Sequence, residues 1–293
     1  SMMAAFKTMA AIMLAMLLVA GCTKMERPGG DSNQSNPHST MDQSADTKRY
    51  REVVFEKARR KSDILYRTAE NLAGETVELL LDVYQPKDDT ETNRPAVILL
   101  HAGGFTFGSK DAGLEPVLAK DLAKMGYVAV SINYRLENPI TDWEGTLANA
   151  TGDAAAAVDW LVANSEQYGV DKNNITLLGY SAGNYLAIHL VYDDIDISWN
   201  QESIVGVVSL ATSYRPDSFS PDPSDPPCFC IHGTEDRTCP LKYSEEIVEA
   251  LTGAGVEAGL YSVEGADHDL YQYYDEVLSV VAECLYRTMV STS

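Results

Sequence analysis

Hydrophobic and polar positions follow a regular order from Arg49 onward. Short apolar runs alternate with longer segments in which apolar residues recur every three or four positions. The runs AVILL at residues 96–100 and YVAVSI at residues 127–132 are apolar at nearly every position. Runs of this length are typical of strands buried on both faces of a parallel sheet. The same reasoning predicts further strands at residues 76–84, 175–178, 204–210, 228–231 and 260–263.

The segments between these runs carry apolar residues at every third or fourth position and therefore predict helices. Gly126 and Gly169 follow two of these segments, where a glycine commonly ends a helix. Because predicted strands and helices alternate, we expect an α/β domain in which helices cover a mostly parallel sheet. The predicted helices span residues 114–125, 145–168, 182–191, 241–251 and 270–286.

The first residues have a different character. Residues 1–21 carry a single charge, Lys7, then an apolar stretch and small residues that lead to Cys22, which is typical of a secretory signal. The ending LVAGC resembles a bacterial lipobox, in which cleavage before the cysteine exposes Cys22 for lipid attachment. We expect residues 22–48 to form a flexible tether, residues 49–293 one catalytic domain, and the protein to be exported and lipid-anchored to the bacterial cell envelope. The alternatives are a secreted protein with an unrelated Cys22, or a short membrane anchor.

Composition narrows the range of partners. The 293 residues include 22 Lys and Arg against 43 Asp and Glu, and the net charge of −21 would repel nucleic acid. No apolar run in residues 49–293 is long enough to predict a membrane-spanning helix. Four cysteines of this part lack the spacing of metal ligands, so we expect no metal and buried thiols, with a disulfide through Cys239 as the alternative. These are Cys228, Cys230, Cys239 and Cys284.

The strongest chemical motif is Gly-x-Ser-x-Gly at residues 179–183, directly after a predicted strand and before a predicted helix. In this context the motif predicts a nucleophile elbow, a tight turn that presents Ser181 and needs small residues two positions before and after it. The helix that begins at Ala182 points its positive end at any oxyanion formed beside the serine. The sequence therefore predicts Ser181 as a nucleophile.

A serine nucleophile needs a base and an acid, and in the chain order typical of a nucleophile elbow both follow the serine, the acid before the histidine. His268, in the sequence GADHD, lies between the last predicted strand and the last helix, and we predict that it is the base. Asp236 precedes it and would orient the imidazole, with the neighbouring Glu235 as the alternative acid. His232 ends a strand just before this acid and is expected to shape the loop that carries it. His189 lies too far along a helix to reach Ser181.

The loop that starts at His101 follows the strand AVILL and contains two adjacent glycines. Acyl transfer develops negative charge on the former carbonyl oxygen, and backbone N–H groups can bind this oxygen only where no side chain blocks the approach. We assign the N–H groups of Gly103, Gly104 and Ala182 to an oxyanion hole. A glycine pair after a strand is otherwise only a turn.

These motifs give the chain a resemblance, over about residues 75–290, to α/β hydrolases of the acetyl esterase/lipase group, related to hormone-sensitive lipase and carboxylesterases. The chain departs from that group at Ala102, where relatives have glycine, at Asn184 after the elbow, and at Thr238-Cys239-Pro240, where valine-proline is usual. The matching segments are LDVYQPKDDTETNRPAVILLHAGGFTFGSK at 81–110, NYR at 133–135, GYSAG at 179–183, HGTEDRTCP at 232–240 and GADHD at 265–269.

The resemblance implies an α/β-hydrolase fold and a serine carboxylesterase that forms an acyl-enzyme on short, acetyl-type esters, with no metal or organic cofactor. Relatives often carry a helical cap, but residues 212–227 and 50–75 are short, so we expect no sizeable cap and an open site. Such a site suits a small-molecule ester or an ester carried on polysaccharide. The alternatives are a serine peptidase of the prolyl-oligopeptidase type and a binding protein that keeps the fold without catalysis.

Overall fold

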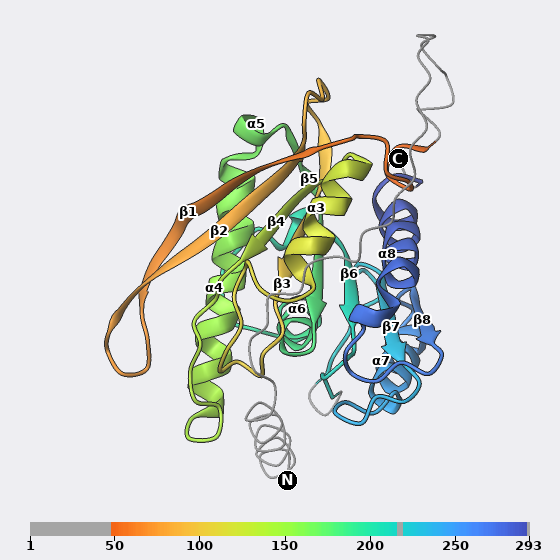
Figure 1. Cartoon of the computed structure of the whole chain (residues 1–293). Coiled ribbons are helices and arrows are strands. Elements are labelled where there is room, and N and C mark those ends of the chain that lie inside the picture. The colour runs from red at the N-terminus through yellow and green to blue at the C-terminus, as the bar shows by residue number, and fades with distance from the viewer. Residues whose placement is uncertain (1–47, 216–218, 292–293) are drawn as a thin grey trace, which may run out of the picture.

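The computed structural model describes residues 48–215 and 219–291, so the expectations for the signal peptide, the tether and Cys22 lie outside the described residues. One eight-stranded sheet runs through the described part in the order β1-β2-β4-β3-β5-β6-β7-β8, with helices on both of its faces (Figure 1). The strands from β3 to β8 pair in parallel, including β3 with β4, whereas β1–β2 and β2–β4 are antiparallel. The sheet is therefore mostly parallel, as predicted.

The strands and helices have the following bounds in chain order. The strands are β1 (Ala58–Glu70), β2 (Thr76–Pro86), β3 (Arg94–Leu100), β4 (Val128–Ile132), β5 (Val170–Tyr180), β6 (Ile204–Leu210), β7 (Cys228–Gly233) and β8 (Ala258–Val263). The α-helices are α3 (Glu115–Met125), α4 (Trp143–Ala163), α5 (Ser165–Tyr168), α6 (Ala182–Tyr192), α7 (Lys242–Gly253) and α8 (Tyr274–Met289), and short 3-10 helices occur at η1 (Gln201–Ser203) and η3 (Tyr271–Tyr273).

The core lies on both faces of the sheet, and β3 shows why. Every residue of β3 is buried, and successive side chains point to opposite faces. Ile98 and Leu100 join the apolar cluster under α4 and α6, whereas Val97 and Leu99 join the cluster under α3 and α8. A strand covered on both faces has no polar side, which explains the continuous apolar run in the sequence.

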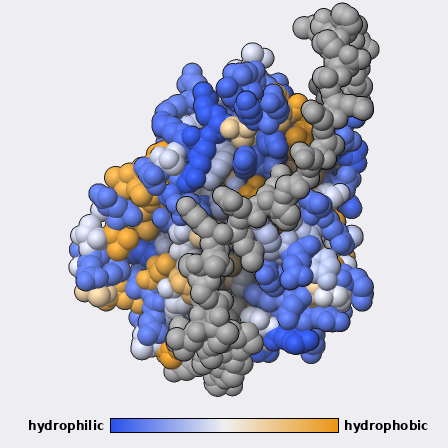
Figure 2. Space-filling view, viewed as in Figure 1, coloured by the Kyte–Doolittle hydropathy of each residue, from blue (hydrophilic) through white to orange (hydrophobic). Residues whose placement is uncertain are grey.

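β1 was not predicted from the sequence, and the structure corrects this. β1 pairs with β2 along its whole length, from Ala58 opposite Pro86 to Glu70 opposite Thr76, and the hairpin reaches beyond the rest of the sheet (Figure 1). The strand lies at the edge and is mostly exposed, so its sequence ARRKSDILYRTAE lacks an apolar run. Apolar colour gathers over this side in Figure 2. Leu65 in β1 and Leu72 in the turn after it are exposed.

The helix predicted for residues 145–168 is in fact two helices. The first helix, α4, begins at Trp143, two residues earlier than expected. Asp142 caps it by accepting a hydrogen bond from the Gly145 N–H. Asn164 ends α4, and the single turn of α5 follows up to Gly169, which has a left-handed backbone with φ of 60°. Residues 164–167, Asn-Ser-Glu-Gln, include neither glycine nor proline, so the boundary left no sign in the sequence.

Candidate active site

The four segments that the sequence singled out all follow parallel strands. Ser181 follows β5, Asp236 follows β7, His268 follows β8, and the glycine pair follows β3. Since parallel strands end at the same edge of a sheet, these residues converge there although they are far apart in the chain.

The turn at Ser181 has the strained geometry of a nucleophile elbow. Ser181 has φ of 52° and ψ of −116°, a conformation that a residue with a side chain rarely adopts. A Cβ atom at Gly179 would overlap the backbone of Gly183, and one at Gly183 would overlap the carbonyl of Leu100. Both small residues of the motif are therefore required by the close approach of α6 to β5 and to the end of β3.

The side chains of Ser181, His268 and Asp236 form one hydrogen-bonded line. The Nε2 atom of His268 lies 2.9 Å from Ser181 Oγ, and its Nδ1 atom lies 2.8 Å from Asp236 Oδ2. An ionised carboxylate can only accept, so Nδ1 carries the imidazole proton and Nε2 is free to accept the proton of the serine hydroxyl. The structure thus brings together Asp236, and not the exposed neighbour Glu235, with the histidine.

Asp236 is satisfied on both of its oxygens. The backbone N–H groups of Thr238 and Cys239 donate to Oδ1 over 2.9 and 2.8 Å, and His268 and His232 contact Oδ2. Burial opposes ionisation of this carboxyl, but the hydrogen bonds from His232 and His268 outweigh burial and hold the pKa of Asp236 well below its usual value. The carboxyl of Asp236 is therefore ionised at neutral pH and can stabilise a protonated His268.

His232 lies beneath the acid and is fully buried. Its Nε2 atom lies 2.7 Å from the carbonyl of Cys239 and 3.1 Å from Asp236 Oδ2, and a carbonyl can only accept, so Nε2 carries the proton. The Nδ1 atom then accepts from the Thr212 N–H and contacts the hydroxyl of Ser244. His232 ties the acid loop to α7 and to the end of β6, in line with the loop-shaping role expected for it.

The loops of the acid and the base are joined directly to each other. The Glu235 N–H donates to the carbonyl of Ala266 over 2.9 Å, and the Arg237 N–H donates to Asp267 Oδ1 over the same distance. A Cβ atom at Gly233 would overlap the Ala266 carbonyl. These contacts fix the separation between Asp236 and His268 without any help from a ligand.

The oxyanion loop keeps N–H groups free. Gly103 has φ of 131° and Gly104 has φ of 59°, and the N–H groups of both residues donate to no partner among the described residues. Ala182 is the first residue of α6, where a helix N–H has no partner within the helix. The assignment of these three donors to an oxyanion hole remains a prediction, and the backbone is arranged so that it is possible.

Sequence reasoning missed the role of Asn184, which it noted only as a departure from relatives. This buried side chain donates to the carbonyls of Leu210 and Ala211 over 2.6 and 2.9 Å and accepts from the Ser213 N–H over 3.0 Å. The Ser213 hydroxyl in turn donates to the carbonyl of Ser181 over 2.8 Å. Asn184 thus fastens the loop after β6 to the elbow, which no glycine could do.

Access to the nucleophile differs from the expected open site. Only 1% of Ser181 is exposed, since the residue lies under the imidazole and is held by the Ser213 loop, whereas 20% of the His268 side chain is exposed. The described residues between β6 and β7, 211–215 and 219–227, contain no helix or strand, so no cap covers the site from this segment.

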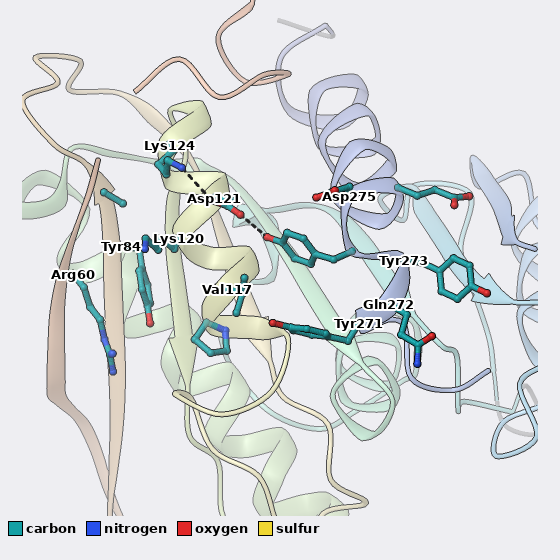
Figure 3. Close-up of a pocket in the computed structure, with 14 residues that line it drawn as sticks. Arg60, Tyr84, Val117, Lys120, Asp121, Lys124, Tyr271, Gln272, Tyr273 and Asp275 are labelled. Atoms are coloured by element: carbon teal, nitrogen blue, oxygen red, sulfur yellow. Dashed lines mark hydrogen bonds and ion pairs between the residues drawn. The ribbon is translucent and has the colours of Figure 1, made fainter. Parts of the chain in front are cut away.

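A cavity of about 1240 Å³ lies elsewhere, between β1, β2, α3 and the start of α8 (Figure 3). Tyr274, one of its lining residues, donates its hydroxyl to Asp121 Oδ2 over 2.7 Å, and Lys124 lies 3.4 Å from the other oxygen of this carboxylate. None of the three residues Ser181, Asp236 and His268 lines this cavity, so we do not include it in the candidate active site.

The remaining candidates are resolved as follows. The four cysteines of the domain are free thiols, and His189 pairs with Asp193 at 2.5 Å, away from the elbow. In the described part of the chain, no group of three or more His, Cys, Asp and Glu side chains could hold a metal ion. Within those same residues, no helix is both long and apolar enough to cross a membrane.

Comparison with known proteins gives three consistent likenesses. Residues 81–201 match the BD-FAE family. The chain is 26% identical to a probable isoprenylcysteine alpha-carbonyl methylesterase of Oryza sativa, over 64% of this chain and 54% of that protein. It is also 26% identical to esterase LipC of Mycobacterium tuberculosis, over 67% of this chain and 58% of that one. The chain thus spans just over half the length of these two curated relatives.

Among solved structures, esterase 2 of Thermogutta terrifontis, phosphorylated by paraoxon, matches with a TM-score of 0.64. The two proteins are 25% identical, and the match covers 80% of this chain and 95% of the solved one. The chain therefore has the α/β-hydrolase fold.

Proposed function

We propose that the protein is a serine carboxylic ester hydrolase that works through an acyl-enzyme, with Ser181 as nucleophile, His268 as base and Asp236 as orienting acid. The observation that carries the proposal is the unbroken line from Ser181 Oγ through the imidazole to Asp236, with both contacts shorter than 3 Å. The esterases among the relatives and the structural neighbours support the same reaction class.

The proposed reaction has two halves. The Ser181 oxygen attacks the ester carbonyl carbon and its proton moves to His268 Nε2, while Asp236 stabilises the resulting imidazolium. The tetrahedral oxyanion accepts hydrogen bonds from the Gly103 and Ala182 N–H groups, with Gly104 as a further donor. The ester C–O bond then breaks, and the leaving alcohol takes the proton from His268. Water repeats the sequence on the acyl-enzyme and releases the acid.

We further propose that the enzyme prefers short, acetyl-type acyl groups, and the aromatic rings near the nucleophile support this. Phe105 directly follows the glycine pair, and Tyr185 lies one helical turn after Ser181. The ring of Trp143 packs edge to face against both, with centroids 5.6 and 5.3 Å away. These rings occupy space beside the elbow, which favours acetyl-type esters over long chains.

The first test compares hydrolysis of 4-nitrophenyl acetate by the wild type and by Ser181→Ala. We expect a fall in kcat of at least ~10³-fold without loss of fold, because nucleophile, base and acid act as a unit. Ser198→Ala, on an exposed serine, is the matched control and should keep full activity. Retained activity in Ser181→Ala would remove the proposal.

A comparison of matched esters and amides separates the esterase from a serine peptidase of the prolyl-oligopeptidase type, which would cleave both. Absence of turnover on every ester and amide, by folded protein, would favour the catalytically inactive binding protein. We expect ester cleavage to exceed amide cleavage, as the relatives with esterase names suggest.

We further propose that the ester can be carried on polysaccharide as well as on a small molecule. Support comes from the segment between β6 and β7, whose described residues form no cap over the sheet edge. Acetylated xylan is the probe: release of acetate from the polymer is the expected result. Turnover of short aryl esters without any release from the polymer would contradict this part alone.

Export and lipid anchoring also remain a proposal, supported by the LVAGC sequence before a polar segment. The test is the mass of the protein recovered from bacterial membranes. A diacylglyceryl group on Cys22, lost in Cys22→Ser together with membrane association, is the expected result. An unmodified Cys22 in the envelope fraction would contradict the proposal.

A further inference from the structure

A carboxyl group that the proposed reaction does not use lies directly behind the oxyanion loop. Glu115 is the first residue of α3, and only 2% of it is exposed. Its Oε1 atom accepts a hydrogen bond of 2.9 Å from the N–H of Ala102, the residue immediately before the glycine pair. A buried acid in contact with this loop needs an explanation beyond helix capping.

Among the described residues, backbone donors influence the carboxyl of Glu115, and no Lys, Arg or His shifts its pKa. Besides Ala102, the backbone N–H groups of Leu114 and of Glu115 itself hydrogen bond to it. The titratable groups that face it are the phenols of Tyr134, after β4, and Tyr180, at the end of β5. Burial outweighs the three backbone hydrogen bonds and raises the pKa of Glu115 to about 7.

The Ala102 contact is one of three hydrogen bonds that hold the start of the oxyanion loop, and we call these three bonds the clamp. The carbonyl of His101 accepts from the Tyr134 hydroxyl over 2.7 Å, and the carbonyl of Ala102 lies 2.7 Å from His101 Nδ1, which must donate to it. His101 is buried and its pKa is lowered to about 4, so the imidazole stays neutral and keeps this arrangement.

The clamp determines where the oxyanion donor points. The peptide group between His101 and Ala102 is held at its carbonyl by Tyr134 and at its N–H by Glu115. The next peptide group is held only at its carbonyl, by the His101 ring, so its free end is the Gly103 N–H. Because a peptide group is planar, fixing the carbonyl fixes the direction of that N–H.

We propose that Glu115 is a positioning residue for the oxyanion hole and that its ionised form holds the loop in the productive geometry. The inference rests on the proposed esterase function. An ionised Glu115 accepts from the Ala102 N–H without competition, whereas protonation of Oε1 would place an O–H against this donor. Protonation therefore weakens the hold on Ala102 and lets the Gly103 N–H turn away from the oxyanion.

The decisive experiment is the pH dependence of kcat, from pH 5.5 to 9, for the wild type and Glu115→Gln with an aryl acetate. Around pH 7, the wild type should show a step of about ten-fold in kcat that is due to Glu115. In Glu115→Gln, kcat at pH 8 should be about ten-fold lower, with KM little changed, and this step should be absent.

Glu144→Gln is the matched control, since Glu144 lies in the first turn of α4 and is exposed. It should keep the wild-type kcat and the wild-type profile. Tyr134→Phe loosens the other end of the same peptide group, so it should lower kcat and still show the step near neutral pH.

The outcomes separate the two proposals. A wild type that hydrolyses no ester fails the proposed function, and the inference fails with it. An active wild type whose kcat follows a single ionisation from pH 5.5 to 9 overturns the inference alone, and this holds even if Glu115→Gln does not fold. Unchanged or increased kcat in folded Glu115→Gln also overturns it.

Discussion

Two buried carboxyl groups lie on the two sides of the candidate site, and they are perturbed in opposite directions. Asp236 accepts two backbone N–H groups and contacts two imidazoles, and its pKa is held below the usual value. Glu115 accepts from the Ala102 N–H, no Lys, Arg or His among the described residues lowers its pKa, and burial raises that pKa to about 7. Both groups are satisfied as hydrogen-bond acceptors.

The difference shows what decides the charge of a buried acid. Backbone donors alone do not offset the cost of taking a carboxylate out of water, whereas an imidazole that donates a proton and can become positively charged does. The acid loop is thus built to keep a permanent charge next to His268. The oxyanion loop, by contrast, carries an acid whose charge depends on pH near neutrality.

The largest expected effect comes from removing the charge of Asp236. Asp236→Asn should lower kcat/KM by about 10³- to 10⁴-fold, because an amide can present its N–H to the ring and favour the wrong imidazole tautomer. Ester hydrolysis assays measure this fall. Glu235→Gln, on the exposed neighbouring carboxyl, is the control, and its kcat/KM should stay within about two-fold of the wild-type value. An equal loss in both variants would contradict the assignment of the acid.

The second effect is on stability, where the raised pKa of Glu115 makes a signed prediction. The unfolded chain ionises this acid near its ordinary value of 4.5 and the folded chain near 7, so the folded state binds the proton more tightly between these values. The free energy of unfolding should fall by about 3 kcal/mol from this group as pH rises through that window.

Denaturant titrations at pH 4.5 and 8 measure this change in the wild type and in Glu115→Gln. The variant should lack the decrease due to residue 115. Asp236 contributes in the opposite sense, since its stabilisation is present above its unfolded pKa and is lost as pH falls through the lower folded pKa. If the free energy of unfolding had the same pH dependence in both proteins, the prediction of a raised pKa for Glu115 in the folded state would be wrong.

The smallest effect concerns His232, whose removal makes the surroundings of Asp236 more like those of Glu115. His232→Phe keeps a ring and removes the donor, so the pKa of Asp236 should rise and kcat should fall by about 10- to 100-fold. His232→Gln can place an amide N–H near the former Nε2 and should retain more activity. The pH profiles of kcat/KM test this order, and equal activity of the two variants would contradict it.

The convergence of Ser181, Asp236 and His268 could be anticipated from the sequence because each residue follows a buried strand. Parallel strands end at one edge, so strand order along the chain is enough to place the three residues near one another. The predicted α/β-hydrolase fold is confirmed by the sheet and by the structural neighbour. It could be predicted because the buried runs of β3 to β8 specify the sheet.

Other features leave no such pattern. β1 is a mostly exposed edge strand whose polar sequence carries no signal, and it forms through backbone pairing with β2. Glu115 looked like an ordinary acidic residue at a helix start, and only folding brings the Ala102 N–H to it. The contacts of Asn184 likewise depend on a loop 26 residues away in the chain. Such roles are tertiary, and sequence spacing does not encode them.

The central claim is that the Ser181 hydroxyl is an activated nucleophile because His268 can take its proton. The most direct test is the mass of the intact, folded protein after treatment with paraoxon, followed by peptide mapping of the modified residue. The account predicts one diethylphosphoryl group, located on Ser181, and almost no labelling in His268→Ala. No adduct on folded wild-type protein, or an adduct on a different residue, would contradict the account.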